Sequence, residues 1–457
     1  MSRPSEEQMA AAKTILLGED QNGSAPPHNP SDNRATVQHL PPEEAWRRCA
    51  ALAHQPRILD RLCADLPLVG LVGEDKSAQL LYLVTTSRLL ERPVSAVVKG
   101  PSSGGKSYSV ETVLGFFPEN AFYGLSGGSE RSLAYSEAPL NHRVLVIYEA
   151  AGMGGDFATY LLRSLLSEGR LRYETVEKTA KGMHARLIER EGPTGLIVTT
   201  TQVKLHPENE TRLLSIPVND TPDQTKNVLL TLAADDPEIG PDLAPWHGLQ
   251  DWLAGGERRV VIPFARRLAE LIPPVAVRLR RDFTTVLGLI RAHALLHRAT
   301  RAVDDQGRII AINEDYAVVR ELVLGLVSAG VGATVRPETR EAVNAVAAFR
   351  ADHPEGVPQA VIASAIKLDR GALSRRIRVA LDGGYLLNRE ERRGRPHRLV
   401  VGDPLPDDVE ILPTVEDCCT VARLREGYTS EATPEQESDL ERLRAKGFVV
   451  IDGEEAA

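Results

Sequence analysis

One short segment of the sequence has the residue types and spacing of a phosphate-binding loop. The segment Gly100-Pro-Ser-Ser-Gly-Gly-Lys-Ser107 fits the pattern G-x-x-x-x-G-K-S/T. In such a loop backbone N–H groups face phosphate oxygens, Lys106 would reach the β and γ phosphates, and the Ser107 hydroxyl would be a ligand of Mg²⁺. We call Gly100–Ser107 the phosphate loop. The pattern predicts that ATP and Mg²⁺ are bound here, by Gly100, Pro101, Ser102, Ser103, Gly104, Gly105, Lys106, Ser107 and Tyr108.

The flanks of the phosphate loop distinguish it from a glycine-rich linker that fits by chance. Before it, Val94–Lys99 is rich in β-branched residues and predicts a short buried strand. After it, apolar residues recur at the spacing of one helix face, at Val110, Val113, Leu114 and Phe117. A strand therefore enters the loop and a helix leaves it.

A second motif follows an apolar run. Val144–Ile147 predicts a buried parallel strand, and Tyr148 and Glu149 come directly after it. P-loop ATPases carry an acidic pair at this point, in which the first acid holds Mg²⁺ through water and the second polarises the attacking water. Glu149 fits the second role and is a candidate Mg²⁺ ligand, although an ordinary carboxylate at a strand end is the alternative. Tyr148 stands where an Asp is expected. We expect this difference to affect the rate of ATP hydrolysis more than the binding of the nucleotide.

The next segment has the pattern of a β-hairpin. Arg170–Val176 and Ala185–Arg190 carry strand signals, and the polar stretch Glu177–His184 between them contains a glycine. The functional interpretation is that the tip of the hairpin is basic and binds the phosphates of a nucleic-acid backbone through Lys178 and Lys181. The alternative is a solvated surface hairpin.

Two further candidates concern catalysis. Gly195–Thr201 predicts a buried strand that ends in hydroxyls, so Thr200 or Thr201 could sense the γ-phosphate, or be an ordinary strand residue. Arg212 follows this strand and is a candidate arginine finger for a neighbouring subunit's nucleotide. A surface salt bridge is the alternative for Arg212.

Size and composition indicate a soluble protein of several domains. The 457 residues suggest roughly two to four domains. There is no run of 18 apolar residues and no basic-then-apolar leader, so we expect a cytoplasmic protein without membrane partners. None of the four cysteines forms a C-x-x-C pair, which argues against a zinc site or a disulfide framework.

Charge is distributed unevenly near the C-terminus. The whole chain has a net charge of −9, but residues 367–398 hold ten Lys/Arg and four Asp/Glu, a net charge of +6. Residues 403–457 hold five Lys/Arg and fifteen Asp/Glu, a net charge of −10. A basic module beside an acidic segment is typical of chains that meet nucleic acid locally.

The basic module resembles a winged helix-turn-helix. Three predicted helices, near 341–351, 358–367 and 370–381, are followed by strands at 385–389 and 397–401. Asp369 can cap the third helix. By this resemblance Arg375 and Arg376 would approach the groove of a DNA duplex, and the wing would neutralise phosphates through Arg392, Arg393 and Arg395. A winged helix used for protein contacts is the alternative.

The order of these parts along the chain resembles that of the AAA+ ATPases. Within this family it is most similar to the hairpin-bearing branch, which includes minichromosome-maintenance helicases and magnesium chelatases. Leu71–Lys76 loosely matches a G-x-E-x-x-K lead-in, and Leu165–Arg172 lies where that branch passes from helix to hairpin. Arg280–His293 is similar to the helix that bears the lid arginine. By that match Arg281 would touch the γ-phosphate, with Arg280 as second choice. The chain is also similar to bacterial, phage and plasmid replication proteins described as primase- or helicase-like.

The resemblance implies an α/β fold: an AAA+ P-loop NTPase core with a helical lid, followed by a C-terminal winged helix-turn-helix domain. The predicted segments are a disordered 1–40, a helical lead-in 41–92, the ATPase core 93–225, the lid 226–337, the winged helix 338–402 and an acidic tail 403–457.

The implied function is that of an ATP-dependent DNA helicase or translocase in the replication of a phage, plasmid or mobile element. It would form a homo-oligomeric ring such as a hexamer, with single-stranded DNA in its channel and duplex DNA at the winged helix. One subunit would supply Lys106, Ser107 and Glu149, and the next would supply Arg212 and Arg281. Two alternatives remain open: an ATP-switched DNA-binding regulator or helicase loader with slow hydrolysis, and a small-molecule P-loop kinase.

Overall fold

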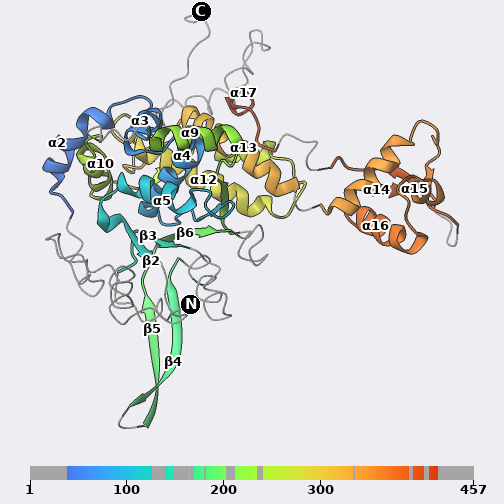
Figure 1. Ribbon diagram of the computed structural model, residues 1–457, viewed down its shortest axis with the longest axis horizontal. Coiled ribbons are helices and arrows are strands. Elements are labelled where there is room, and N and C mark those ends of the chain that lie inside the picture. The colour runs from blue at the N-terminus through green and yellow to red at the C-terminus, as the bar shows by residue number, and fades with distance from the viewer. Residues whose placement is uncertain are drawn as a thin grey trace, which may run out of the picture. The chain divides into compact units, whose positions relative to one another are not determined.

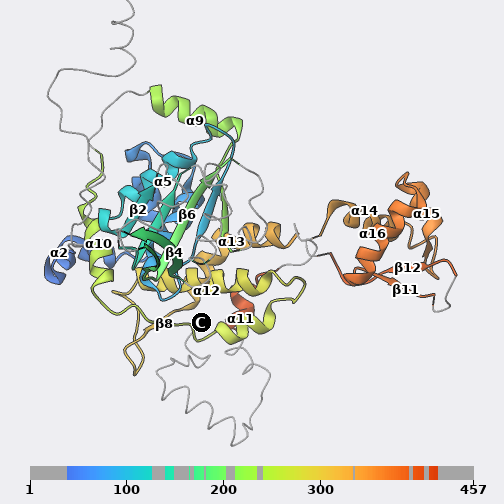
Figure 2. The same cartoon turned by 90° about the horizontal axis from the view of Figure 1, so that it is seen from below.

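Figures 1 and 2 show a computed structural model of the chain. It describes residues 39–125, 139–148, 164, 169–179, 182–201, 212–233, 240–332, 335–390, 395–405 and 411–419. The predicted site residues outside these ranges are Glu149, Lys181, Arg392 and Arg393. Lys178 is described in its backbone only. The predicted N-terminal segment falls almost wholly outside these ranges, as does most of the predicted acidic tail.

A parallel sheet of five strands forms the centre of the protein, which confirms an α/β fold. In the order β2-β3-β6-β1-β7, the strands are Phe122–Leu125, Arg143–Ile147, Thr194–Thr200, Ala96–Lys99 and Leu214–Pro217. Every pairing in this sheet is parallel, so the carboxyl ends of all five strands lie at one edge. Near-continuous apolar runs such as Val144–Ile147 are typical of strands that are covered on both faces.

One face of the sheet belongs to the main hydrophobic core. Its inward residues alternate along the strands, as the two-residue period of a strand requires, and they include Val98, Val146, Ile197 and Ile216. Helices α4 (Asp75–Thr86) and α5 (Lys106–Gly115) contact each other, and α4 also contacts β7. Helix α4 belongs to the predicted helical lead-in, and its second half is buried throughout.

Along the chain, most helices come either before the first strand of the sheet, β1, or after the last, β7. Before β1 they are α2 (Pro42–Ala53), α3 (Ile58–Asp65), η2 (Pro67–Val69) and η3 (Ser87–Leu89), and η4 (Glu119–Ala121) precedes β2. After β7 they are α9 (Pro222–Ala233), α10 (Ala244–Ala254), α11 (Ala265–Leu271), α12 (Leu279–Leu296) and α13 (Asn313–Gly332). No single helix in the described ranges is long and apolar enough to cross a membrane; α13 and α14 (Pro337–Ala348) meet that criterion only when they are counted together.

A buried polar network fixes α4 against α10. The guanidinium of Arg88 donates to Gln250 Oε1 at 2.7 Å and to the Thr85 carbonyl at 3.2 Å. Gln250 Nε2 in turn donates to the Tyr82 hydroxyl at 3.0 Å. Burial lowers the pKa of Arg88 to about 10, so the group stays charged at neutral pH. Because a buried charge is costly without partners, these bonds make the position of α4 specific.

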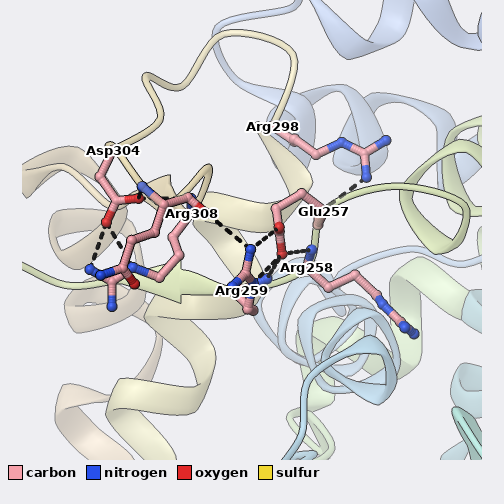
Figure 3. A network of polar contacts seen from close by, with 7 residues as sticks. Glu257, Arg258, Arg259, Arg298, Asp304 and Arg308 are labelled. Atoms are coloured by element: carbon pink, nitrogen blue, oxygen red, sulfur yellow. Dashed lines mark hydrogen bonds and ion pairs between the residues drawn. The ribbon is translucent and has the colours of Figure 1, made fainter.

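Charged side chains also connect the short parallel strands β8 (Val260–Val261) and β9 (Ile309–Ile310), which the helical sequence pattern does not indicate (Figure 3). Arg259 pairs with Glu257 at 2.6 Å and donates to the Gln306 carbonyl at 3.0 Å. Hydrogen bonds from Arg259 lower the pKa of Glu257 to about 2. Both partners lie near solvent, so we assign this network a role in local geometry and little stabilising energy.

The predicted hairpin is present but longer than the sequence indicates. Strands β4 (Leu171–Thr179) and β5 (Gly182–Arg190) form a two-stranded antiparallel sheet of their own. The strands continue through most of the predicted polar loop, and their last described pair is Thr179 with Gly182. Gly182 has a φ of +115°, a conformation that favours glycine.

Residues 335–405 fold around a separate small core that includes Val346, Ile362, Leu373, Ile377, Leu386 and Leu399. Its elements are α14, β10 (Val357–Pro358), α15 (Gln359–Ala365), α16 (Arg370–Asp382), β11 (Leu386–Asn388) and β12 (Arg398–Val401). The three strands form an antiparallel sheet in the order β10-β12-β11. As predicted, Asp369 caps α16, because its carboxylate accepts from the backbone N–H groups of Gly371 and Ala372.

Part of the predicted acidic tail belongs to the main core. Ile411 and Leu412 are buried in it, and the Tyr316 hydroxyl of α13 donates to the Pro413 carbonyl at 2.7 Å. The short helix α17 (Val415–Cys419) contacts α13 and α11. The segment therefore returns to the core after the small domain, a long-range contact that local charge does not reveal.

Candidate nucleotide site

The phosphate loop occupies the carboxyl edge of the sheet, between the end of β1 at Lys99 and the start of α5 at Lys106. Strand and helix flank the loop as the sequence predicts. Ser103 and Gly105 have φ values of +64° and +78°, so the backbone curls tightly before the helix begins. This curl directs N–H groups at the amino end of α5 toward one point, as an anion site requires.

Glycine is needed in this loop for space as well as conformation. A Cβ at Gly100 would lie 2.2 Å from a methyl group of Val218, and one at Gly104 would lie 3.0 Å from the Pro101 carbonyl. Around Gly105 there is open space. A backbone that is free of side chains on its concave side fits the phosphates of a nucleotide.

Lys106 is buried and lies over the loop. Its Nζ donates to the Pro101 carbonyl at 2.6 Å. This bond holds the ammonium group inside the turn, at the place where the motif requires a cation for the β and γ phosphates. Ser107 is half-buried at the next position, and its hydroxyl is the described group that fits Mg²⁺ in this motif.

The residues before α4 pack against the same loop and helix. The exposed Tyr108 donates through its hydroxyl to the Val69 carbonyl at 3.2 Å. Glu74 is buried and accepts from the backbone N–H of Asn219 at 2.8 Å, and burial raises the pKa of its carboxyl group. Thus the lead-in segment that resembles G-x-E-x-x-K lies beside the phosphate loop and is fixed by its glutamate.

Thr200 lies next to the phosphate loop. It pairs with Lys99 in the register of β6 and β1, and it is fully buried, whereas Thr201 is exposed beyond the strand end. Strand β6 lies between β1 and β3, so Thr200 stands between the loop and the strand that leads to Tyr148 and Glu149. Of the two threonines, Thr200 has the position expected for a γ-phosphate sensor.

Tyr148 directly follows β3, and its backbone N–H donates to the Leu125 carbonyl at 3.0 Å. Burial raises the pKa of its phenol to about 12, and the nearby Glu111 acts in the same direction. The phenol is therefore neutral at physiological pH and supplies no negative charge to a metal ion. Glu149 itself lies outside the described residues.

Arg212 lies at the opposite edge of the sheet from the phosphate loop. It lies two residues before β7, and Leu214 of β7 pairs with Ala96 at the amino end of β1. Arg212 lines a cavity of about 270 Å³ together with Lys99, Arg278 and Asp282. Arg212 thus lies toward the amino edge of the sheet, whereas the phosphate loop begins at the carboxyl edge after Lys99.

The same cavity brings the start of α12 close to Arg212. Arg278 and Asp282 form an ion pair at 3.0 Å, and the remaining wall includes Val286, Val323 and Leu326. Sequence reasoning missed this pair; the i,i+4 spacing of opposite charges was its only signal. The predicted lid arginine Arg281 and the second choice, Arg280, are both exposed in the first turn of α12.

The predicted DNA-binding arginines differ in their surroundings. Arg375 and Arg395 are exposed, but Arg376 is half-buried and forms an ion pair with Glu341 of α14. Arg378 is exposed on the same helix as Arg375 and is a further candidate. Thus the structure separates the two neighbouring arginines of α16: one faces solvent and the other connects two helices.

Comparisons with known proteins found likenesses among solved structures. No protein-family model matches the sequence, and no curated protein matches it. A full-length MCM homolog from Methanopyrus kandleri has a TM-score of 0.41 and 14% sequence identity, over 63% of this chain and 61% of that chain. The Aeropyrum pernix ORC1 protein in complex with DNA has a TM-score of 0.25 and 14% identity, over 82% of this chain and 98% of that one. The present chain thus spans less than two thirds of the Methanopyrus protein.

Proposed function

We propose that this protein is an oligomeric ATPase of the AAA+ class that couples ATP hydrolysis to movement on DNA. The observation that carries the proposal is the phosphate loop at the carboxyl edge of a parallel sheet, with Lys106 inside the turn and Thr200 on the adjacent strand. A glycine-rich linker that fitted the motif by chance would not be expected to lie at this edge of the sheet. Nor would it be expected to have glycines where a Cβ would collide with its neighbours, as at Gly100 and Gly104.

The chemistry that we assign to this site is in-line attack of water on the γ-phosphorus of ATP, which breaks the bond to the β,γ-bridging oxygen and yields ADP, phosphate and a proton. Lys106 and the loop N–H groups would hold the phosphates, Ser107 would hold Mg²⁺, and Glu149 would orient the attacking water. Thr200 would bond the γ-phosphate or that water. Arg212, with Arg281 from the same subunit, would stabilise charge at the nucleotide of a neighbouring subunit, in keeping with the position of Arg212 before the amino end of β7.

The proposed work is on DNA, in a cytoplasmic replication system of a phage, plasmid or mobile element. Hairpin residues Lys178 and Lys181 would face single-stranded DNA in the channel of a ring. The 335–405 domain would be a winged helix that meets duplex DNA through α16 and the segment between β11 and β12. Its three helices, its three-stranded sheet and its exposed arginines support this part.

Two assays on the purified full chain test this proposal. Phosphate release from ATP should rise several-fold when single-stranded DNA is added, and a forked duplex should be separated in an ATP-dependent reaction. The Lys106→Ala variant should do neither. ATP hydrolysis that ignores DNA, with no strand separation, would contradict the helicase assignment.

The second candidate is an ATP-switched DNA-binding regulator or helicase loader with slow hydrolysis. Tyr148 favours it, since a neutral phenol in place of a carboxylate leaves Mg²⁺ with fewer anionic ligands. This candidate predicts that ATP changes the affinity for DNA while turnover stays slow and no strand separation occurs.

A further inference from the structure

Helix α9 exposes an unusual number of large apolar side chains. Of its twelve residues only Gln224 is buried. Val228, Leu229, Leu230 and Leu232 have exposed fractions of 38%, 60%, 61% and 73%. Val228 and Leu229 lie four and three positions before Leu232, so these three side chains are neighbours on the helix surface. Together with the adjoining Leu230 we call them the α9 patch. Scattered single leucines are normal on a surface, whereas a group of exposed apolar side chains of this size is often a functional contact site.

The base of α9 is fixed beside the phosphate loop. Gln224 Nε2 donates to the Val72 carbonyl at 2.7 Å, in the same segment that contacts Tyr108 through Val69. The helix begins shortly after the carboxyl end of β7 at Pro217, whose carbonyl accepts from the Ser77 hydroxyl of α4. The α9 patch therefore stands at the edge of the sheet that carries the nucleotide site.

The size of the α9 patch suits part of a protein interface. Four aliphatic side chains of this exposure offer on the order of 300 Å² of apolar surface. That is about a third of the ~800 Å² that each partner buries in an interface of standard size. Two exposed carboxylates at the start of the helix, Asp220 and Asp223, would form a polar rim.

The occupant that fits this position is a second copy of the chain. This step rests on the proposed function: if Arg212 acts on a neighbour's nucleotide, then the neighbour must approach the carboxyl edge of the sheet, where the loop lies. The surface that the neighbouring copy would present includes the exposed cations Arg280 and Arg281 at the start of α12. Their charge is opposite to that of Asp220 and Asp223 beside the α9 patch. Contact between two different surfaces is what a head-to-tail ring requires.

We propose that the α9 patch is the surface on which the adjacent subunit docks over the phosphate loop. Docking there would bury the leucines and bring Arg212 of the adjacent copy toward the phosphates at Lys106. Assembly and catalysis would then depend on α9 although none of its side chains belongs to the phosphate loop.

The experiment uses the full chain with two exposed leucines changed together, Leu229→Glu and Leu232→Glu. The matched control is Val379→Glu, an exposed apolar residue of α16 with an exposed fraction of 49%. Sedimentation velocity with a slowly hydrolysed ATP analogue should show an assembly constant weakened by more than about tenfold in the α9 variant and unchanged in the control. Fluorescent ATP should bind the α9 variant with normal affinity, since the loop is intact.

Mixed subunits separate this inference from the proposed function. Lys106→Ala and Arg212→Ala proteins, each inactive alone, should regain ATP hydrolysis when they are mixed, because one supplies the loop and the other supplies the arginine. Introducing the α9 changes into the Arg212→Ala partner, which supplies the intact loop, should abolish this rescue. Rescue or assembly that persists with the α9 changes overturns the inference, as does a wild-type protein that stays monomeric. Failure of wild-type protein to bind ATP would overturn the proposed function instead.

Discussion

Lys99 and Thr200 are register partners at the carboxyl ends of two adjacent parallel strands. Lys99 is the last residue of β1 before the phosphate loop, and Thr200 is the last residue of β6. Paired residues point to the same face of a sheet, so Thr200 and Lys99 share a face at the carboxyl edge, where the phosphate loop begins. Of the two threonines that the sequence offers as γ-phosphate sensors, Thr200 is therefore the one beside the strand that leads into the phosphate loop.

Replacing Thr200 with valine should reduce ATP turnover more than ATP binding. Valine keeps the shape of the buried side chain and removes only the hydroxyl, so a hydrogen bond made to the γ-phosphate or the water in the transition state is lost. We expect a fall in kcat of about 10²-fold. Steady-state kinetics with parallel binding measurements check this, and the exposed neighbour variant Thr201→Val serves as control. Equal effects of the two variants would contradict the role of Thr200.

Replacing Tyr148 with aspartate should speed hydrolysis and lower the Mg²⁺ concentration needed for it. The native phenol is neutral because burial raises its pKa to about 12, whereas an aspartate would add a negative charge beside Glu149. Titration of ATPase rate against Mg²⁺ measures the change. Tyr148→Phe, which also carries no charge, should titrate as the native protein does; a similar response of both variants would argue against a metal role at this position.

Three arginines of the proposed winged helix, Arg375 and Arg376 of α16 and Arg395 before β12, should contribute unequally to DNA affinity. Removing Arg375 or Arg395, which are exposed, should reduce the slope of log affinity against log salt by about one each. Removing Arg376 should leave that slope almost unchanged, because its guanidinium is paired with Glu341. Fluorescence anisotropy with a short duplex at several salt concentrations distinguishes them. Equal slopes for the Arg375→Ala and Arg376→Ala variants would show that the Glu341 pair does not restrict Arg376.

Stability should fall in acid partly because of His297. This side chain is buried between α12 and its neighbours, and neither ring nitrogen has a hydrogen-bond partner in the described part of the chain. Burial lowers its pKa to about 3, and the nearby His293 and Arg301 act in the same direction, while Asp315 opposes them.

Because the unfolded imidazole takes up a proton near pH 6.5, the unfolded state binds more protons between pH 6.5 and about 3. This contribution to stability is complete above pH 6.5 and is lost as pH falls, by up to about 1.4 kcal/mol per pH unit. Denaturant unfolding at pH 7 and pH 5 should show a smaller pH effect in His297→Leu than in the native protein. An identical pH effect in both proteins would contradict the account of His297.

The sequence predicts well those features that depend on neighbouring residues. Glycines at fixed offsets and a change from strand to helix period locate β1, the phosphate loop and α5, because turn geometry and periodicity are local properties. Asp369 is predictable as a cap for the same reason. By contrast, the polar residues around Lys178 suggest a loop, yet the strands continue there because cross-strand pairing decides the length of a hairpin.

Features that join distant segments could not be predicted in this way. Arg376 meets Glu341 across two helices, and Ile411 returns to the core after a whole domain has intervened. The leucines of α9 have the spacing of ordinary core residues, and only the structure shows that they are exposed. The placement of Arg212 near the amino edge of the sheet likewise depends on the parallel pairing of β7 with β1, which no local pattern contains.

Calorimetric titration of the purified chain with ATP in the presence of Mg²⁺ tests the central claim most directly. The account predicts saturable binding of about one nucleotide per chain, and a loss of at least about a hundredfold in affinity or turnover in the folded Lys106→Ala variant. Absence of binding by native, folded protein, or equal binding and full hydrolysis by the Lys106→Ala variant, would contradict it.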